Sequence, residues 1–176
     1  EFGAGSTTTA RIILEAAPNL AGYVPVDISA EFLVREASRL QHDFPELDVL
    51  PVVADFTRRF ELPAQVRDLR RIGFFPGSTI GNFEPHEAAR FLRHAAQLLG
   101  PGASLIIGVD LVKDAEVLRA AYNDAAGVTA EFNLNLLRRI NRDLGADFDL
   151  SAFRHYAYYN AEDGRIEMHL RCVSPQ

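Results

Sequence analysis

The hydrophobic positions of this chain follow two spacings, which alternate through roughly its first 109 residues. Leu33, Ala37, Leu40 and Phe44 recur every three or four residues and therefore share one face of a helix. Short apolar runs predict buried strands, and they occur at 22–26, 49–54, 71–75 and 103–109. This alternation favours a parallel sheet covered by helices on both faces, because parallel neighbours need a crossover connection.

Local signals predict where several helices begin and end. The hydroxyl groups of residues 6–9 are suited to cap a first helix, which is expected to stop at Pro18. Ser29 is placed to cap the second helix. Pro85 suits the first turn of a later helix and Gly100 suits its end.

The last third of the chain has a different pattern. Helices are expected at 113–126 and 129–144, where they could shape a lid or wall. The second carries apolar side chains at helical spacing: Phe132, Leu136, Ile140 and Leu144. Strict alternation of apolar and polar residues over 165–172, after a turn at 160–164, predicts a β-hairpin with 153–159.

The predicted fold class is therefore α/β: a doubly wound, Rossmann-like sheet, mostly parallel, that ends in an antiparallel hairpin. That ending is typical of class I methyltransferases that use S-adenosylmethionine (SAM). With 176 residues, of which 48% are hydrophobic, the chain is long enough for one core, so we expect a single domain over 1–176. It opens without methionine, two residues ahead of Gly3, so we expect a piece of a longer protein that lacks most of the first strand.

Composition narrows the classes of function. A net charge of −6 and a pI near 5.3 argue against nucleic-acid binding. The single cysteine, Cys172, excludes an internal disulfide and suits a reducing compartment, so a cytoplasmic location is expected, and no apolar run is long enough for a membrane span. The histidines show no metal-ligand spacing and are expected at the surface: His42, His86, His94, His155 and His169. Hydrolase and kinase motifs are also absent from the sequence.

The first candidate site is a loop for a nucleotide-like cofactor. Gly3 and Gly5 stand where a strand turns into a helix, because glycine lets the backbone approach a ligand closely. Asp27 follows about 20 residues later, where a carboxylate can accept hydrogen bonds from ribose hydroxyls. NAD and SAM sites share both features. Thr8 occupies the position of the third glycine in the NAD fingerprint, which favours SAM.

Asp55 and Phe56 follow the 49–54 strand. An acid next to an aromatic ring can accept from the amino group of adenine and stack on its ring. A cap beside a core phenylalanine is the alternative interpretation.

The residues after the 71–75 strand are expected to face a substrate. Gly77 and Asn82 lie in this loop, and the amide of Asn82 offers a donor and an acceptor to a small zwitterion. An asparagine near glycines is also a common turn former. Tyr122, on the helix over 113–126, is either a second substrate contact or a half-buried helix residue.

A resemblance to a known family extends over nearly the whole chain. It is carried by the runs EFGAGS, YVPVDIS, VVADF, FFPGSTIGNFEP, GVDLVKD, AYNDAAGVTAEFN and RIEMHLR, of which GSTIGNF is the most specific. Together they resemble the histidine-specific, SAM-dependent methyltransferases of ergothioneine biosynthesis. The resemblance implies methylation of the α-amino group of L-histidine to give hercynine.

The resemblance also implies roles for the candidate residues. Gly3 and Gly5 would hold the methionine part of SAM, Asp27 its ribose, and Asp55 with Phe56 its adenine. Substrate binding would fall to three residues, namely Gly77, Asn82 and Tyr122. The family's glycine-loop lysine is missing from residues 6–9, and its members extend beyond both ends of this chain, including groups that recognise the imidazole ring.

Three alternatives stay open from the sequence. The enzyme could methylate another small amino acid or amine, or the chain could be a cofactor-binding core without activity. An NAD-dependent oxidoreductase is the third. In each case the expected partner is a small molecule, and no oligomeric state follows from the sequence.

Overall fold

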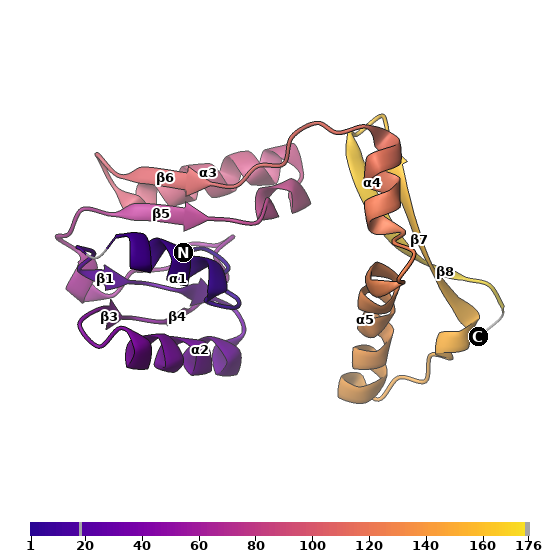
Figure 1. Cartoon of the computed structure of the whole chain (residues 1–176), viewed down its shortest axis with the longest axis horizontal. Coiled ribbons are helices and arrows are strands. Elements are labelled where there is room, and N and C mark those ends of the chain that lie inside the picture. The colour runs from indigo at the N-terminus through magenta and orange to yellow at the C-terminus, as the bar shows by residue number, and fades with distance from the viewer. Residues whose placement is uncertain (18, 175–176) are drawn as a thin grey trace. The chain divides into compact units, whose positions relative to one another are not determined.

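A computed structural model describes residues 1–17 and 19–174, so the predicted helix stop at Pro18 lies outside the described residues. The chain divides into two compact units, Glu1–Asp110 and Leu111–Gln176 (Figure 1). Within the described residues, no helix is both long and apolar enough to cross a membrane.

The first unit alternates short strands with helices. Its helices are α1 (Thr8–Ala16), α2 (Ala30–Asp43) and α3 (Pro85–Leu99), with 3-10 turns η1 (Ala64–Val66) and η2 (Thr79–Asn82). Its strands are β1 (Gly22–Tyr23), β2 (Val26–Asp27), β3 (Asp48–Val49), β4 (Val52–Val53), β5 (Ile72–Phe75) and β6 (Ser104–Ile107). The pairs β1–β3, β2–β4 and β5–β6 are all parallel, which confirms the predicted strand direction.

The first three residues link two of these strand pairs. The Gly3 amide donates to the Val26 carbonyl at 2.9 Å, and the Phe2 amide donates to the Phe74 carbonyl at 2.9 Å. Phe2 also forms a parallel bridge with Val26. The start of the chain therefore lies between β2 and β5, and the glycine loop follows directly.

Two predicted strands are each divided in the structure. The 22–26 run gives β1 and β2, and the 49–54 run gives β3 and β4, because Pro25 and Pro51 carry no amide hydrogen to donate. The expectation that 49–54 is a buried strand is wrong, since all of its residues are partly or fully exposed and Val53 is 52% exposed.

The core of this unit consists of two apolar clusters. One joins α1 and α2 to Tyr23, and includes Leu14 and Leu40. The other is built from phenylalanine rings, in which Phe75 and Phe91 lie 4.6 Å apart between centroids. The predicted stripe on α2 is confirmed, because Leu33, Ala37 and Leu40 are buried and the partly buried Phe44 packs against the cluster that contains Leu40.

The helix-end predictions have mixed outcomes. Pro85 begins α3, with a capping box from Glu84 and Glu87, and Gly100 ends it at φ 82°. Thr7 and Ser29 occupy the N-cap positions of α1 and α2, but neither side chain caps its helix. The Ser29 backbone amide instead donates to the Asp27 carboxylate, so the side chain of Asp27 provides the hydrogen-bond acceptor at the start of α2.

The second unit packs two helices on a hairpin. Its elements are α4 (Ala115–Tyr122), α5 (Val128–Leu144), the 3-10 turn η3 (Leu150–Ala152), β7 (Phe153–Asn160) and β8 (Arg165–Cys172). The strands pair antiparallel from Phe153 with Cys172 to Asn160 with Arg165, which confirms the hairpin.

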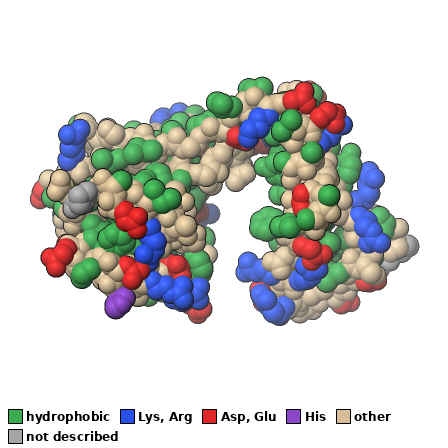
Figure 2. All heavy atoms as spheres, in the orientation of Figure 1, with side chains coloured by type: hydrophobic (Ala, Val, Ile, Leu, Met, Phe, Trp, Pro, Cys, Tyr) green, Lys and Arg blue, Asp and Glu red, His purple; other side chains and the backbone are tan. Residues whose placement is uncertain are grey.

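The apolar stripe predicted on 129–144 does not form the packing face of α5. Phe132 and Leu136 are 70% and 56% exposed, whereas Leu137 is buried. Asn133 and Asn141 bond to the hairpin and the loop before it, so they mark the side of α5 that packs. Figure 2 shows apolar side chains exposed on this unit.

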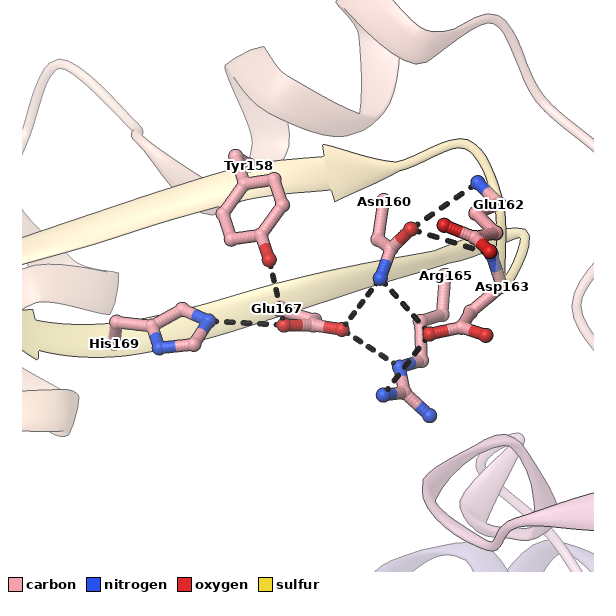
Figure 3. Close-up of polar contacts among 7 residues, drawn as sticks. All are labelled: Tyr158, Asn160, Glu162, Asp163, Arg165, Glu167 and His169. Carbon is pink, nitrogen blue, oxygen red and sulfur yellow. Dashed lines mark hydrogen bonds and ion pairs between the residues drawn. The ribbon is translucent and has the colours of Figure 1, made fainter.

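The tip of the hairpin is organised around Glu167 (Figure 3). One carboxylate oxygen accepts from Asn160 Nδ2 at 3.0 Å and Arg165 Nε at 2.8 Å. The other accepts from the Tyr158 hydroxyl and lies 3.0 Å from His169 Nε2. These donors, led by Asn160, lower the pKa of Glu167 from 4.5 to about 2.

The hairpin is accordingly expected to lose stability in acid. A carboxyl with a lowered folded pKa stabilises the fold above its unfolded pKa of 4.5, and that contribution is lost as the pH falls toward about 2. Thermal unfolding should show Glu167→Gln less stable than the parent chain near neutral pH, with the difference vanishing in acid. Glu162→Gln, at the exposed turn, is the control; a constant gap at all pH values would contradict this assignment.

Candidate functional site

The glycine loop adopts the conformation that its sequence predicts. Gly3 and Gly5 have φ values of 68° and 45°, in the left-handed region that glycine favours. A Cβ added at Gly3 would lie 3.1 Å from Phe56 Cε1. The loop therefore needs glycine at Gly3 both for its φ and for its close approach to Phe56.

Asp27 holds this loop from the end of β2. Its Oδ2 accepts from the Gly5 amide at 3.1 Å, and its Oδ1 accepts from the Ser29 amide at 2.9 Å. Each carboxylate oxygen has capacity for a further hydrogen bond. Asp27 thus ties the glycine loop to the start of α2 and still has acceptors to offer a ligand.

Asp55 stands beyond β4, the strand that pairs with β2. Its Oδ1 accepts from the Thr57 amide at 3.0 Å and from the Thr57 hydroxyl at 2.6 Å, while Oδ2 lies 3.1 Å from Arg58 Nε. The bonds from Thr57 lower the pKa of the Asp55 carboxyl. Asp55 therefore caps a turn, and its ionised carboxylate can also accept a ligand's hydrogen bond.

Phe56 belongs to the phenylalanine cluster of the core. Its ring packs edge-on against Phe75 at 5.6 Å and Phe91 at 5.8 Å between centroids. The residue is nevertheless only half-buried. The interpretation of Phe56 as a core phenylalanine is thus confirmed, and its stacking on adenine stays a prediction.

The loop after β5 turns sharply through two left-handed residues. Gly77 has φ 73°, and Ser78 has φ 56°, which is unusual for a residue with a side chain. The Ser78 hydroxyl accepts from the Asp110 amide at 2.9 Å, which fixes the turn against the chain beyond β6. Sequence reasoning missed Ser78, because nothing in its local sequence marks a left-handed serine.

Gly108, just after β6, lets this loop pack closely against the backbone because it has no side chain. A Cβ added there would lie 3.1 Å from the Gly77 amide nitrogen and 3.3 Å from that of Ser78. Gly108 was not among the residues predicted from sequence, although a glycine at a strand end can signal close backbone contact.

Gly108→Ala is therefore expected to destabilise the chain by about 1–3 kcal/mol, because the crowding atoms are backbone and cannot turn aside. Chemical denaturation would measure the loss. Gly81→Ala in the same loop is the control, since its added Cβ would meet Ser78 Oγ at 3.8 Å, an ordinary contact. Equal effects of the two substitutions would show that Gly108 is not a special position.

Asn82 ends η2 and is exposed. Among the described residues its side-chain amide has no hydrogen-bond partner, so it is available to a ligand. The next residue, Phe83, packs against Phe56 with centroids 6.5 Å apart. The loop predicted to bind substrate therefore adjoins the ring predicted to bind cofactor.

Tyr122 lies in the second unit, where it is the last residue of α4 and is half-buried. Its carbonyl oxygen lies 2.7 Å from His155 Nε2. Within the first unit, by contrast, the structure brings the glycine loop together with Asp27 and Phe56, and Phe56 with the loop that holds Asn82.

A mostly apolar cavity of about 500 Å³ is lined by residues of β1 and β5, including Tyr23 and Ile72. The Tyr23 hydroxyl donates to the Glu1 carboxylate at its edge, and burial raises the pKa of that carboxyl. None of the predicted site residues lines this cavity. No pattern in the sequence indicates this cavity.

Within the described residues, no group of three or more His, Cys, Asp or Glu side chains could hold a metal ion. What the first unit offers is a left-handed glycine loop, carboxylates at two neighbouring strand ends and a half-exposed ring. Features of this kind could hold a nucleotide-like cofactor.

Comparison with known proteins gives the family context. The family described as histidine-specific methyltransferase, SAM-dependent, matches residues 1–176. The histidine N-alpha-methyltransferase of Mycobacterium tuberculosis (strain CDC 1551 / Oshkosh) is 43% identical over 180 residues, covering 100% of this chain and 55% of the relative. That of Mycolicibacterium smegmatis is 42% identical over 179 residues, with the same coverage.

A fungal protein is similar as well. Ergothioneine biosynthesis protein 1 of Neurospora crassa is 30% identical over 179 residues, covering 90% of this chain and 20% of the relative. The chain thus spans about half the length of the bacterial relatives and a fifth of the fungal one.

Proposed function

The chain belongs to the family of histidine-specific, SAM-dependent methyltransferases, and from this premise we propose that it methylates the α-amino nitrogen of L-histidine. The product after repeated transfer is hercynine, on the route to ergothioneine. The match of the family over residues 1–176 carries the proposal, because it includes the strand ends and both loops rather than a glycine motif alone. The names of the bacterial and fungal relatives support the same substrate and pathway.

The proposed fold is the doubly wound methyltransferase sheet. Hydrogen bonds from the first three residues to both Val26 and Phe74 support an order in which the first strand is central. In such sheets ligands bind outside the carboxyl ends of the strands. Gly5, Asp27 and Asp55 all belong to that end in the first unit.

On the cofactor side, Gly3 and Gly5 would hold the methionine part of SAM. Their left-handed backbone supports this assignment, as does the open space at Gly5, where an added Cβ would meet only the Gly3 carbonyl oxygen at 3.9 Å. Asp27 would accept from the ribose hydroxyls, since both its oxygens have capacity left after bonding Gly5 and Ser29. Asp55 and Phe56 would bind adenine by its amino group and its ring.

On the substrate side, the loop from Gly77 to Asn82 in the first unit would bind the amino-acid end of histidine. In the second unit, Tyr122 is proposed by itself as a substrate contact. The exposed Asn82 amide can donate to a carboxylate and accept from an amino group. Bound SAM would supply the methyl group of its sulfonium, and the neutral thioether of S-adenosylhomocysteine would be the leaving group. The protein's task is then to hold a neutral amine in line and exclude water, so no strong base is assigned.

A turnover assay tests the proposal. The chain is incubated with SAM and L-histidine, and mass spectrometry follows products that gain one, two and three methyl groups. Histamine, which lacks the carboxylate, and L-phenylalanine, which lacks the imidazole, serve as comparison substrates. Preferred methylation of L-histidine supports the proposal, whereas equal turnover of L-phenylalanine favours a broader amino-acid methyltransferase.

A further inference from the structure

His155 is not the surface residue that the sequence suggested. It is half-buried on β7, with both ring nitrogens in contact with other elements of the second unit. Its Nε2 lies 2.7 Å from the carbonyl oxygen of Tyr122, and its Nδ1 lies 3.1 Å from Asn133 Nδ2 on α5. One imidazole therefore joins α4, α5 and the hairpin.

The neighbours of His155 determine which nitrogen carries the hydrogen. Asn133 Nδ2 also donates to the His169 carbonyl at 3.0 Å, and a carbonyl can only accept. Asn133 thus presents its NH₂ group to both partners, so His155 Nδ1 must accept. The hydrogen then resides on Nε2, which donates to the Tyr122 carbonyl.

A second side chain fixes the same helix end. Asn123 Nδ2 donates to the Ala157 carbonyl at 3.0 Å, and the Ala157 amide donates back to Asn123 Oδ1 at 3.3 Å. The last carbonyls of a helix lack partners within it. In α4 the Tyr122 carbonyl accepts from His155 instead. Tyr122 and Asn123 together therefore bind the end of α4 to β7.

We propose that His155 is a positioning residue for substrate binding, acting through Tyr122. This inference rests on the proposed function, in which Tyr122 contacts the amino acid. The hydroxyl of Tyr122 has no hydrogen-bond partner among the described residues, so it is available to a ligand. By fixing the backbone of Tyr122, the His155–Asn133 pair sets where that hydroxyl points before the substrate arrives.

Three variants of the chain test the role. His155→Phe keeps an aromatic ring but loses both nitrogens, whereas His155→Gln keeps an amide that reaches the place of Nε2. His169→Phe is the control, because His169 lies on the same hairpin but contacts Glu167 and Tyr158 instead of Tyr122. Calorimetry measures the affinity for L-histidine and for S-adenosylhomocysteine, and hydrogen exchange measures protection of the amides of residues 119–123.

For His155→Phe we expect L-histidine affinity to fall about tenfold, with S-adenosylhomocysteine affinity unchanged and faster exchange at 119–123. His155→Gln should recover most of the L-histidine affinity, and His169→Phe should bind as the parent does. Unchanged L-histidine affinity in His155→Phe would overturn the proposal, as would equal losses for both ligands. If the parent chain bound no L-histidine, the proposed function would fail instead, and exchange at 119–123 would still decide whether His155 fixes Tyr122.

Discussion

Asn82→Ala is expected to weaken L-histidine binding about 100-fold while leaving S-adenosylhomocysteine binding nearly unchanged. The Asn82 amide is exposed in the loop after β5, and in the proposed complex it makes hydrogen bonds to the charged amino-acid end. Two bonds to charged groups, at about 1.5 kcal/mol each, account for a loss of that size. Isothermal titration of each ligand into the parent and variant chains measures the two affinities separately.

The matched control is His86→Ala, a substitution four residues along at an exposed position near the start of α3. It should leave both affinities as they are in the parent chain. If Asn82→Ala lowered the two affinities equally, the loop would be a structural element shared by both ligands and Asn82 would have no substrate role.

Asp27→Ala is expected to have the reverse effect, with S-adenosylhomocysteine affinity falling by at least about 100-fold. The substitution removes the proposed acceptor for the ribose hydroxyls and also releases the Gly5 amide that shapes the glycine loop. The amides of Gly5 and Ser29 both lose their acceptor, so we also expect a stability loss of about 1–3 kcal/mol.

Asp43→Ala provides the comparison for Asp27. Asp43 makes a surface ion pair with Arg11, at 43% side-chain exposure, and such pairs contribute little to stability. Circular dichroism would establish that each variant is folded before titration. A folded Asp27→Ala chain with the affinity of the parent would show that the ribose assignment is wrong.

The strand ends could be predicted from sequence because their signals are local. Apolar runs that end before Asp27, Asp55 and Gly77 predicted parallel strands with these residues just beyond their ends. The structure has parallel strand pairs at these positions. The left-handed conformations of Gly3 and Gly5 also follow from residue type.

Other features depend on contacts between distant residues. Ser78 holds a left-handed backbone because its hydroxyl meets Asp110, and His155 meets Tyr122 across 33 positions of sequence. No short-range pattern encodes either contact. Periodicity likewise placed Phe132 and Leu136 on one face of α5, but it does not say whether that face is covered.

Calorimetric titration of the 176-residue chain with S-adenosylhomocysteine, followed by L-histidine in the same cell, tests directly whether the chain binds both ligands. S-adenosylhomocysteine is expected to bind at one site, and L-histidine is then expected to bind to the complex. A chain that is folded by circular dichroism yet binds no S-adenosylhomocysteine would contradict this expectation.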